Sequence, residues 1–347
     1  PPLPLGEENE TSAAENPAEK PRETETEEEQ ISALLNSMSV EEKVGQLFFV
    51  RAPETGEAEA VAKWKLGGYV LFGRDFKDKS AGEIIETLAS AQAASKIPLL
   101  LGVDEEGGSV VRVSSNPQLR RTKFSSPQAL FCKGGMEAIC AEVRERDRLL
   151  HALGINVNLA PVADVSTNPH DFIYPRSFGQ DAEKTSEYVA AVVTQMKQDG
   201  MGATLKHFPG YGSNLDTHTG IAHDKRTVDS LRKADFLPFT AGIEAVDSLP
   251  ASLSPALHKI LREELRFEGV LMTDDLAMEA VTAYAKDGSV AVLALLAGND
   301  LVLTTDFSTQ IPQVLAAVAD GTLPMETIDG ALRRVLRWKG QLGLLGD

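Results

Sequence analysis

The chain has 347 residues, of which 42% are hydrophobic, and its formal net charge is −17 at pH 7. This length and composition are those of a globular protein with one large domain or two small ones. The negative charge argues against binding to nucleic acid or to an anionic membrane surface, and no apolar run approaches the roughly 18 residues that a membrane-spanning helix needs.

The first 30 residues form an acidic segment, with ten glutamates against Lys20 and Arg22 and a net charge of −8. So few apolar side chains cannot offset the entropy that folding would cost. We therefore expect residues 1–30 to be a disordered tether and residues 31–347 to be the folded domain. Because the chain begins at Pro1, we expect an exported bacterial protein, secreted or tethered to the membrane, whose leader has been removed. A cytoplasmic protein with a flexible tail is the alternative.

Near-continuous apolar runs recur along the folded part, as in parallel strands that are covered on both faces. They lie at residues 44–50, 67–73, 98–104, 156–165, 202–209, 269–275 and 300–304. Amphipathic patterns predict helices at 81–95, 135–153, 182–199, 228–245, 254–265 and 327–340. This alternation predicts an α/β fold, a single (β/α)8 barrel of the TIM type. Its sixth strand is missing, because residues 210–268 contain no such run.

Polar residues stand where the apolar runs end, and in a barrel these strand ends meet on one face. They are Arg74, Asp104, Glu105, Glu106, Asp164, Lys206, His207, Asp274 and Asp275, with Arg176 in the loop YPRSFG. Carboxylates accept hydrogen bonds in pairs, and Lys, Arg and His donate them. Such a ring suits a ligand rich in hydroxyl groups.

The loop KHFPGYGSNLDTHTG places Asp216 two residues before His218. In an extended loop both side chains point the same way, and an aspartate beside a histidine orients the ring and stabilises its charged form. This pair fits a general acid/base, although a surface loop with no catalytic role is the alternative. Asp274, at a strand end, fits the carboxylate nucleophile of a retaining glycosidase, whereas Asp275 better fits a helix N-cap.

A metal site is a further alternative, because His207, His218 and His223 with Asp216 or Asp274 could hold zinc or two metal ions. No HExxH pattern supports it. We predict that the protein uses no metal and no cofactor.

The chain resembles the β-N-acetylglucosaminidases of glycoside hydrolase family 3 from residue 31 to residue 345. The segments that carry the resemblance are EEKVGQLFFV, GGYVLFGRDF, GVDEEGGSVVRV, GINVNLAPVADV, RSFGQDAE, KHFPGYGSNLDTHTG and FEGVLMTDDLAMEAV. The resemblance implies a retaining, exo-acting enzyme that removes terminal N-acetylglucosamine from peptidoglycan fragments or related glycans, and we expect it to act as a monomer.

Roles for individual residues follow from the same resemblance. Asp274 would form the covalent glycosyl-enzyme, and His218 would be the acid/base with Asp216 as its partner. The residues that would bind the sugar are Asp104, Arg176, Lys206 and His207, with Arg74 as a weaker candidate. Many β-glucosidases of the family take their acid from a second domain. This sequence ends soon after the predicted helix at 327–340, so we expect the acid on the DTH loop.

Two departures from the family pattern stand out. Tyr211 occupies a position where many relatives have histidine, outside the catalytic positions, so we expect a difference between subgroups. Relatives carry their sixth strand between segments like GIEA and LPASLS, which here nearly adjoin at Ala245–Val246. Either the barrel is incomplete or residues are missing from the sequence there. We favour the second explanation, because every other strand and site residue is present.

Two other functions compete with this interpretation. One is a β-glucosidase or an N-acetylglucosaminide phosphorylase of the same fold, which a dependence of turnover on phosphate would reveal. The other is an inactive sugar-binding barrel, which rests only on the Ala245–Val246 junction.

Overall fold

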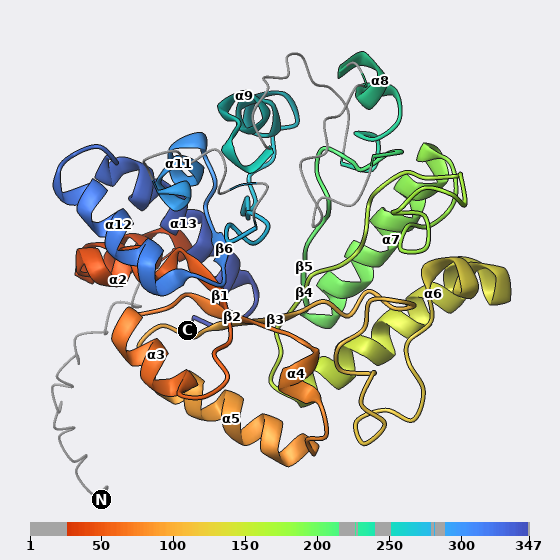
Figure 1. Cartoon of the computed structure of the whole chain (residues 1–347), viewed down its shortest axis with the longest axis horizontal. Coiled ribbons are helices and arrows are strands. Elements are labelled where there is room, and N and C mark those ends of the chain that lie inside the picture. The colour runs from red at the N-terminus through yellow and green to blue at the C-terminus, as the bar shows by residue number, and fades with distance from the viewer. Residues whose placement is uncertain are drawn as a thin grey trace, which may run out of the picture.

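The structure is a computed structural model that describes residues 26–214, 226, 228–239, 251–278, 281 and 289–345. These residues form a six-stranded parallel sheet at the centre of the molecule (Figure 1). The strands are β1 (Phe48–Arg51), β2 (Gly68–Leu71), β3 (Leu100–Val103), β4 (Val157–Asn158), β5 (Gly202–Ala203) and β6 (Val302–Thr304). Their order in the sheet is β5-β4-β3-β2-β1-β6.

This order is that of a barrel in which the last strand returns to the first. Strands β1 to β5 are neighbours in chain order, and Phe49 of β1 pairs with Gly68 of β2 on one side and with Leu303 of β6 on the other. An isolated parallel bridge between Met272 and Leu301 adds the predicted run at 269–275 beside β6.

In the part of the chain that the structure describes, the sheet is open between β5 and the segment at Met272, which is where the missing sixth strand was expected. In the described ranges, nothing pairs β5 with the segment at Met272, the two edges that such a strand would join. The junction at Ala245–Val246 lies outside those ranges.

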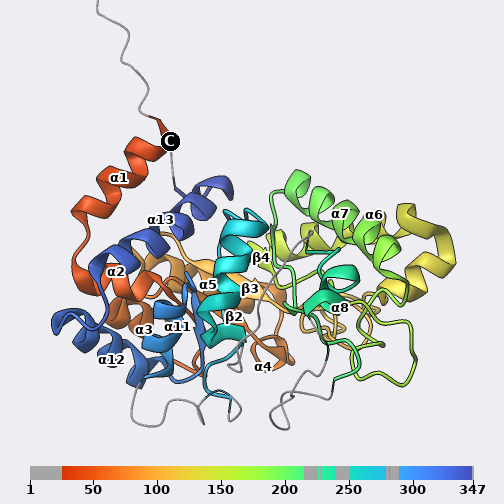
Figure 2. The same cartoon turned by 90° about the horizontal axis from the view of Figure 1, so that it is seen from above.

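Helices surround the sheet, with α6 and α7 on one side and α11, α12 and α13 on the opposite side (Figures 1 and 2). They are α1 (Glu27–Ser37), α2 (Val40–Gln46), α3 (Glu57–Trp64), α4 (Gly73–Phe76), α5 (Ala81–Ala93), α6 (Pro127–Ala152), α7 (Ala182–Asp199), α8 (Val228–Lys233), η2 (Ala251–Leu253), α9 (Pro255–Lys259), η3 (Ile260–Glu264), α11 (Val290–Ala297), α12 (Phe307–Ala319) and α13 (Met325–Gln341). None of the helices in the described ranges is both long and apolar enough to cross a membrane.

Local sequence signals explain where several helices begin and end. Helix α7 occupies the predicted range because Asp181 caps its first turn and Gly200 ends it with a left-handed backbone (φ 76°). Helix α6 begins at Pro127, before the predicted start at 135, because Ser126 caps it there. The backbone leaves helical geometry at Gly134 and Gly135 and then resumes, so the predicted helix is the second half of α6.

Several predicted boundaries differ from the structure. The predicted strands at 156–165 and 202–209 are short, β4 and β5, and the predicted helix at 228–245 is α8 only as far as Lys233, since residues 234–239 form turns. The first half of the predicted strand at 44–50 belongs to α2, because Ser39 and Glu42 form a capping box that starts a helix. The predicted helix at 254–265 is split into α9 and a π-helical turn, η3. Residues Glu27–Gln30, which we assigned to the tail, form the start of α1, where Thr26 is the cap; residues 1–25 lie outside the described ranges.

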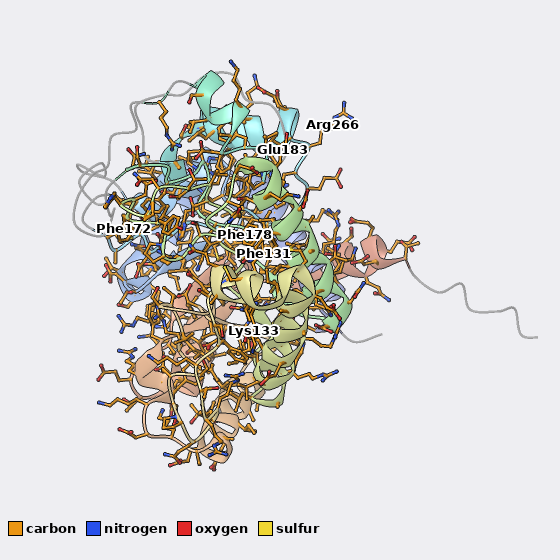
Figure 3. All side chains as sticks on the ribbon, turned by 90° about the vertical axis from the view of Figure 1, so that its right-hand side faces the viewer. Phe131, Lys133, Phe172, Phe178, Glu183 and Arg266 are labelled. Carbon is orange, nitrogen blue, oxygen red and sulfur yellow. The ribbon has the colours of Figure 1, made fainter. Side chains whose placement is uncertain are left out.

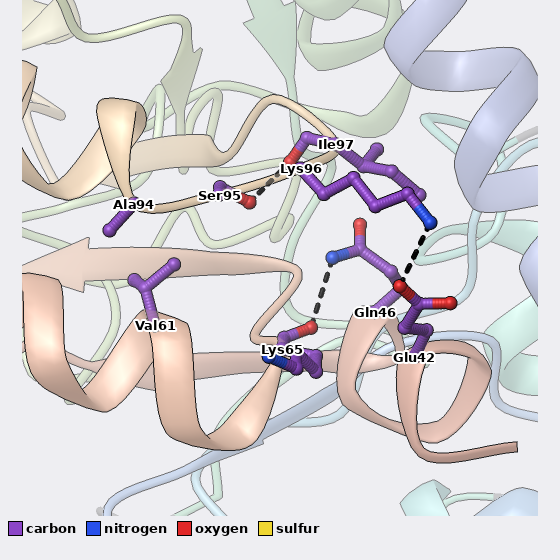
Figure 4. A pocket seen from close by; sticks show the side chains of 8 residues that line it. All are labelled: Glu42, Gln46, Val61, Lys65, Ala94, Ser95, Lys96 and Ile97. Carbon is purple, nitrogen blue, oxygen red and sulfur yellow. Dashed lines mark hydrogen bonds and ion pairs between the residues drawn. The ribbon is translucent and has the colours of Figure 1, made fainter. Parts of the chain in front are cut away.

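The amino-terminal ends of the first strands are held by a buried lysine on α13. Lys339 has no exposed surface, and its Nζ donates to Gln46 Oε1 at 2.7 Å, to the Gly67 carbonyl at 3.0 Å and to the Pro98 carbonyl at 2.7 Å. Beside Gln46 lies a pocket of about 110 Å³ whose lining includes Lys96 (Figure 4). This pocket is at the end of the strands opposite to the predicted site.

Candidate active site

Several of the predicted site residues lie beyond the carboxyl ends of strands in one part of the sheet. Asp104 directly follows β3, and Lys206 and His207 follow β5. A parallel bridge between Val162 and Lys206 continues the pairing of β4 with β5 as far as the site. The sheet therefore holds these backbones in register where the side chains are needed.

One network joins the acidic loop after β3 to the cations. Lys206 Nζ lies 2.7 Å from Asp104 Oδ1 and 2.6 Å from Glu106 Oε1. Arg176 binds Glu106 through two bonds, Nε to Oε2 at 3.0 Å and Nη2 to Oε1 at 2.8 Å. This paired geometry matches a planar guanidinium to a carboxylate. Side chains from three separate segments thus form a single charged group of contacts.

The network keeps Glu106, Lys206 and Arg176 ionised. Burial by itself would raise the pKa of Glu106, but Lys206 and Arg176 outweigh it and hold that pKa at about 2. Burial would likewise lower the pKa of Lys206, and the carboxylates of Asp104 and Glu106 outweigh it, so that pKa is raised. The pKa of Arg176 is raised against burial mainly by Glu106. These three side chains therefore carry constant charges near neutral pH.

His207 is fixed between two partners. Its Nδ1 lies 2.6 Å from Asp164 Oδ2, and its Nε2 lies 3.0 Å from Arg176 Nη2. A guanidinium can only donate, so Nε2 accepts and the ring proton sits on Nδ1, which donates to Asp164. Asp164 also accepts from the amides of His207 at 3.2 Å and Tyr211 at 2.7 Å. In this arrangement His207 positions other groups and has no free nitrogen with which to protonate a leaving group.

Glu105 builds the loop that completes the network. Its buried carboxylate accepts from the amides of Arg112 and Val113, each at 2.7 Å, and from Ser114. This folds the loop back, so that Arg112 Nη2 lies 3.8 Å from Asp104 Oδ2. We did not predict Arg112, because only the folded loop brings it to Asp104. Glu106 and Asp164 were noted at strand ends, but their partners could not be read from the sequence.

The two aspartates of the MTDDLAM segment differ in their surroundings. Asp275 accepts from the Ala277 amide at 2.9 Å and from the Thr305 amide at 3.0 Å, so it caps the turn and ties it to the end of β6. Asp274 is exposed, and its Oδ1 accepts from the Asp275 amide at 2.8 Å. No other hydrogen bond or ion pair within the described ranges engages Asp274. Among the described residues, the structural role therefore falls to Asp275 and not to Asp274.

Arg74 does not join the network. It donates to the Ala52 carbonyl and lies 3.0 Å from Glu54 Oε1, both just after β1. Its role in sugar binding stays a prediction.

The predicted acid/base pair, Asp216 and His218, lies outside the described ranges, as does His223. Within those ranges, no group of three or more His, Cys, Asp or Glu side chains could hold a metal ion. The metal alternative depends on His218 and His223, so the prediction that no metal is needed stays a prediction.

Comparisons with known proteins agree with this arrangement. Residues 39–338 match the model of the "Glycosyl hydrolase family 3 N terminal domain". The chain is 32% identical over 281 residues to a beta-hexosaminidase of Idiomarina loihiensis, covering 75% of this chain and 82% of that protein. It is 34% identical over 303 residues to a beta-hexosaminidase of Stenotrophomonas maltophilia, covering 80% and 87%.

Solved structures show the same likeness. A glycoside hydrolase family 3 beta-N-acetylglucosaminidase from Paenibacillus sp. superposes with a TM-score of 0.79 at 29% identity, covering 90% of this chain and 64% of that chain. LpqI of M. tuberculosis superposes with a TM-score of 0.78 at 28% identity, covering 89% and 96%. The predicted fold class is thereby confirmed. The chain belongs to the glycosyl hydrolase family 3 N-terminal domain family and is an enzyme of the β-N-acetylhexosaminidase type.

Proposed function

We propose that the protein is a retaining, exo-acting β-N-acetylglucosaminidase in which Asp274 is the nucleophile and His218, supported by Asp216, is the acid/base. The observation that carries the proposal is the contrast at the end of the MTDDLAM strand. Asp275 is engaged by two amides, whereas among the described residues the exposed Asp274 carboxylate accepts only from the amide of its neighbour. A nucleophile must keep a lone pair free for the anomeric carbon.

The charged network would bind the terminal sugar. Asp104 accepts from Lys206 on one oxygen and keeps further lone pairs on both for sugar hydroxyls. Lys206 and Arg176 can donate to the oxygens of the same sugar. Glu106 is only 7% exposed, so we assign it to holding these two cations and not to contacting the ligand. Such pre-arranged donors and acceptors reduce the cost of ordering the site when substrate arrives.

The reaction would proceed in two displacements. Asp274 Oδ forms a bond to C1 as the bond from C1 to the leaving oxygen breaks, and that oxygen takes the proton of His218. Water then attacks C1, His218 takes a proton from it, and the bond from C1 to Asp274 breaks. The free enzyme is restored, and the sugar keeps its β configuration.

The arrangement of His207 supports an acid on the DTH loop. Both ring nitrogens of His207 are already engaged, by Asp164 and by Arg176. The histidine that protonates the leaving group must therefore come from elsewhere. His218, which follows Asp216 by two positions in the sequence, supplies the residue type needed for that role.

Trapping of the covalent intermediate tests the proposal. A 5-fluoro N-acetylglucosaminyl fluoride should slow the second displacement and leave a sugar ester that peptide mass spectrometry finds on Asp274. Asp274→Ala should lose nearly all turnover and recover part of it with azide, giving the α-glycosyl azide. The matched variant Asp275→Ala should lose stability and gain nothing from azide. A label on Asp275 or Asp104 would overturn the assignment.

Substrate and outcome can be separated by product analysis. We propose fragments of peptidoglycan as the natural substrate, which predicts a higher kcat/KM for a disaccharide ending in N-acetylmuramic acid than for chitobiose. Release of free N-acetylglucosamine in the absence of phosphate supports a hydrolase, and release of a sugar phosphate only with phosphate supports a phosphorylase. Prolonged EDTA treatment should leave turnover in place. Loss that zinc restores would favour the metal alternative.

A further inference from the structure

Phe172 is an exposed aromatic residue on the loop that carries Arg176 into the site. Its exposed fraction is 37%, whereas Phe178, two residues after Arg176 in the sequence, is only 1% exposed. Figure 3 places Phe172 towards the edge of the molecule, apart from Phe178 and Phe131, which pack on each other. Single exposed apolar residues are common and need no explanation. Phe172 differs from a scattered apolar residue because ring contacts connect it to the site.

The backbone on both sides of Phe172 is anchored. The Asp171 carboxylate accepts from Ser166 Oγ at 2.8 Å and from Asn168 Nδ2 at 3.1 Å. Ile173 has no exposed surface and packs with Val162 and Tyr211. Because both flanking residues are held, the exposure of the Phe172 ring comes from a fixed loop conformation.

A series of ring contacts connects Phe172 to the site. Its ring centroid lies 5.6 Å from that of Tyr211, with the two planes tilted by 46°. Tyr211 in turn meets His207 edge to face, with centroids 5.1 Å apart. His207 is bound to Arg176. Two ring contacts and the hydrogen bond between His207 and Arg176 thus connect the exposed Phe172, at the rim of the site, to the charged network.

We propose that Phe172 is a platform for the leaving-group sugar, the part of the substrate beyond the bond that is cleaved. This inference rests on the proposed function. The charged network takes the terminal sugar, and an exo-acting enzyme leaves the next sugar pointing outwards to the rim. A pyranose ring presents an apolar face of C–H groups, which an exposed aromatic ring can cover. Phe172 therefore gives specificity for a substrate whose leaving group is a ring.

Paired substrates test the platform in the full-length chain. The kcat/KM of Phe172→Ala is compared with that of the parent on chitobiose and on N-acetylglucosaminyl fluoride, whose leaving group has no ring. An aromatic contact of typical strength predicts that the loss on chitobiose exceeds the loss on the fluoride by about three- to tenfold. Phe172→Trp should restore the preference. Ile85→Ala, which alters a 43% exposed residue on α5, should match the parent on both substrates.

Equal losses on the two substrates would overturn the platform, because they would mean that Phe172 acts only by supporting Tyr211 and His207. No loss on either substrate would overturn it as well. Binding measured by calorimetry separates this inference from the proposed function. The platform predicts that Phe172→Ala weakens binding of chitobiose more than binding of free N-acetylglucosamine. If Phe172→Ala shows this difference from the parent, but the parent hydrolyses neither chitobiose nor N-acetylglucosaminyl fluoride, the proposed function is refuted and the platform is supported.

Discussion

Replacement of Glu106 by glutamine tests how the charged network is stabilised. The change keeps the shape of the side chain and removes the charge that Lys206 and Arg176 share. Those cations lower the pKa of Glu106 from 4.5 to about 2 against the effect of burial. At about 1.4 kcal/mol per pKa unit, the ionised carboxylate contributes roughly 3 kcal/mol to the free energy of unfolding at pH 7. Loss of one partner from a buried ion pair typically costs a similar amount, about 3–5 kcal/mol.

The pH dependence of this effect has a definite sign. The pKa of Glu106 is lower in the folded state, so the contribution is fully present above pH 4.5 and is lost as the pH falls towards 2. The difference in free energy of unfolding between the parent and Glu106→Gln should be roughly 3 kcal/mol at pH 5 to 7 and less than half of that at pH 3. Denaturant titrations of both proteins at pH 7, 5 and 3 measure it.

Glu145→Gln is the matched control. Glu145 pairs with Arg120 at 3.1 Å, but 61% of its side chain is exposed, and an exposed pair contributes about 0–1 kcal/mol. Glu106→Gln should also raise KM, because Lys206 and Arg176 lose the carboxylate that holds them towards the ligand. A loss below 1 kcal/mol at pH 7, or a difference that does not shrink at pH 3, would refute the reasoning.

The remaining predictions concern the buried lysine, the tail and the acid. Burial lowers the pKa of Lys339 to about 7, so the unfolded chain binds that proton more tightly than the folded chain. The free energy of unfolding of the parent should therefore rise by about 1.4 kcal/mol per pH unit above pH 7, relative to Lys339→Met. A constant difference between the two proteins in urea titrations at pH 7 and 9 would contradict this. Deletion of residues 1–25 should not change the melting temperature. Deletion of residues 1–30 should lower it, because the longer deletion removes the Thr26 cap of α1 and the contacts of Glu28 with Arg333 and Arg337. Equal melting temperatures of the two deletion variants would show that the start of α1 contributes nothing to stability. His218→Ala should lose about 10²–10⁴-fold in kcat/KM on a disaccharide and much less on an activated aryl glycoside, and an unchanged dependence on the pKa of the leaving group would remove the acid from the DTH loop.

Local signals in the sequence were sufficient to locate several strands and some helices. The ends of α7 depend on Asp181 and Gly200, which adjoin the helix, so they could be predicted. The apolar runs located β2, β3 and β6, because parallel strands that are buried on both faces appear in the sequence as near-continuous apolar runs. Residues at the ends of such strands must share one face, and this rule predicted Asp104, Lys206 and His207 as members of one site.

Other features depended on neighbours that are far away in the chain. The start of β1 was misplaced, because the Ser39–Glu42 capping box outweighs the apolar run that follows it. Arg112 reaches Asp104 only after Glu105 folds the loop back, and the predicted candidate Arg74 instead contacts groups after β1.

The sequence by itself determined which residue types gather at the strand ends, because the period of hydrophobicity and the caps are local properties. Only the tertiary structure decided what each of them does. Glu106 meets Lys206 although they are 100 positions apart in the sequence, and this contact sets the charge of both. Arg176, which donates to Nε2 of His207, and the Asp164 carboxylate, held beside β5 by the Val162–Lys206 bridge, together decide which nitrogen of His207 carries the proton. Hydrogen bonds and charge interactions act through space, so their partners follow from the packing of the strands and cannot be read from spacing along the chain.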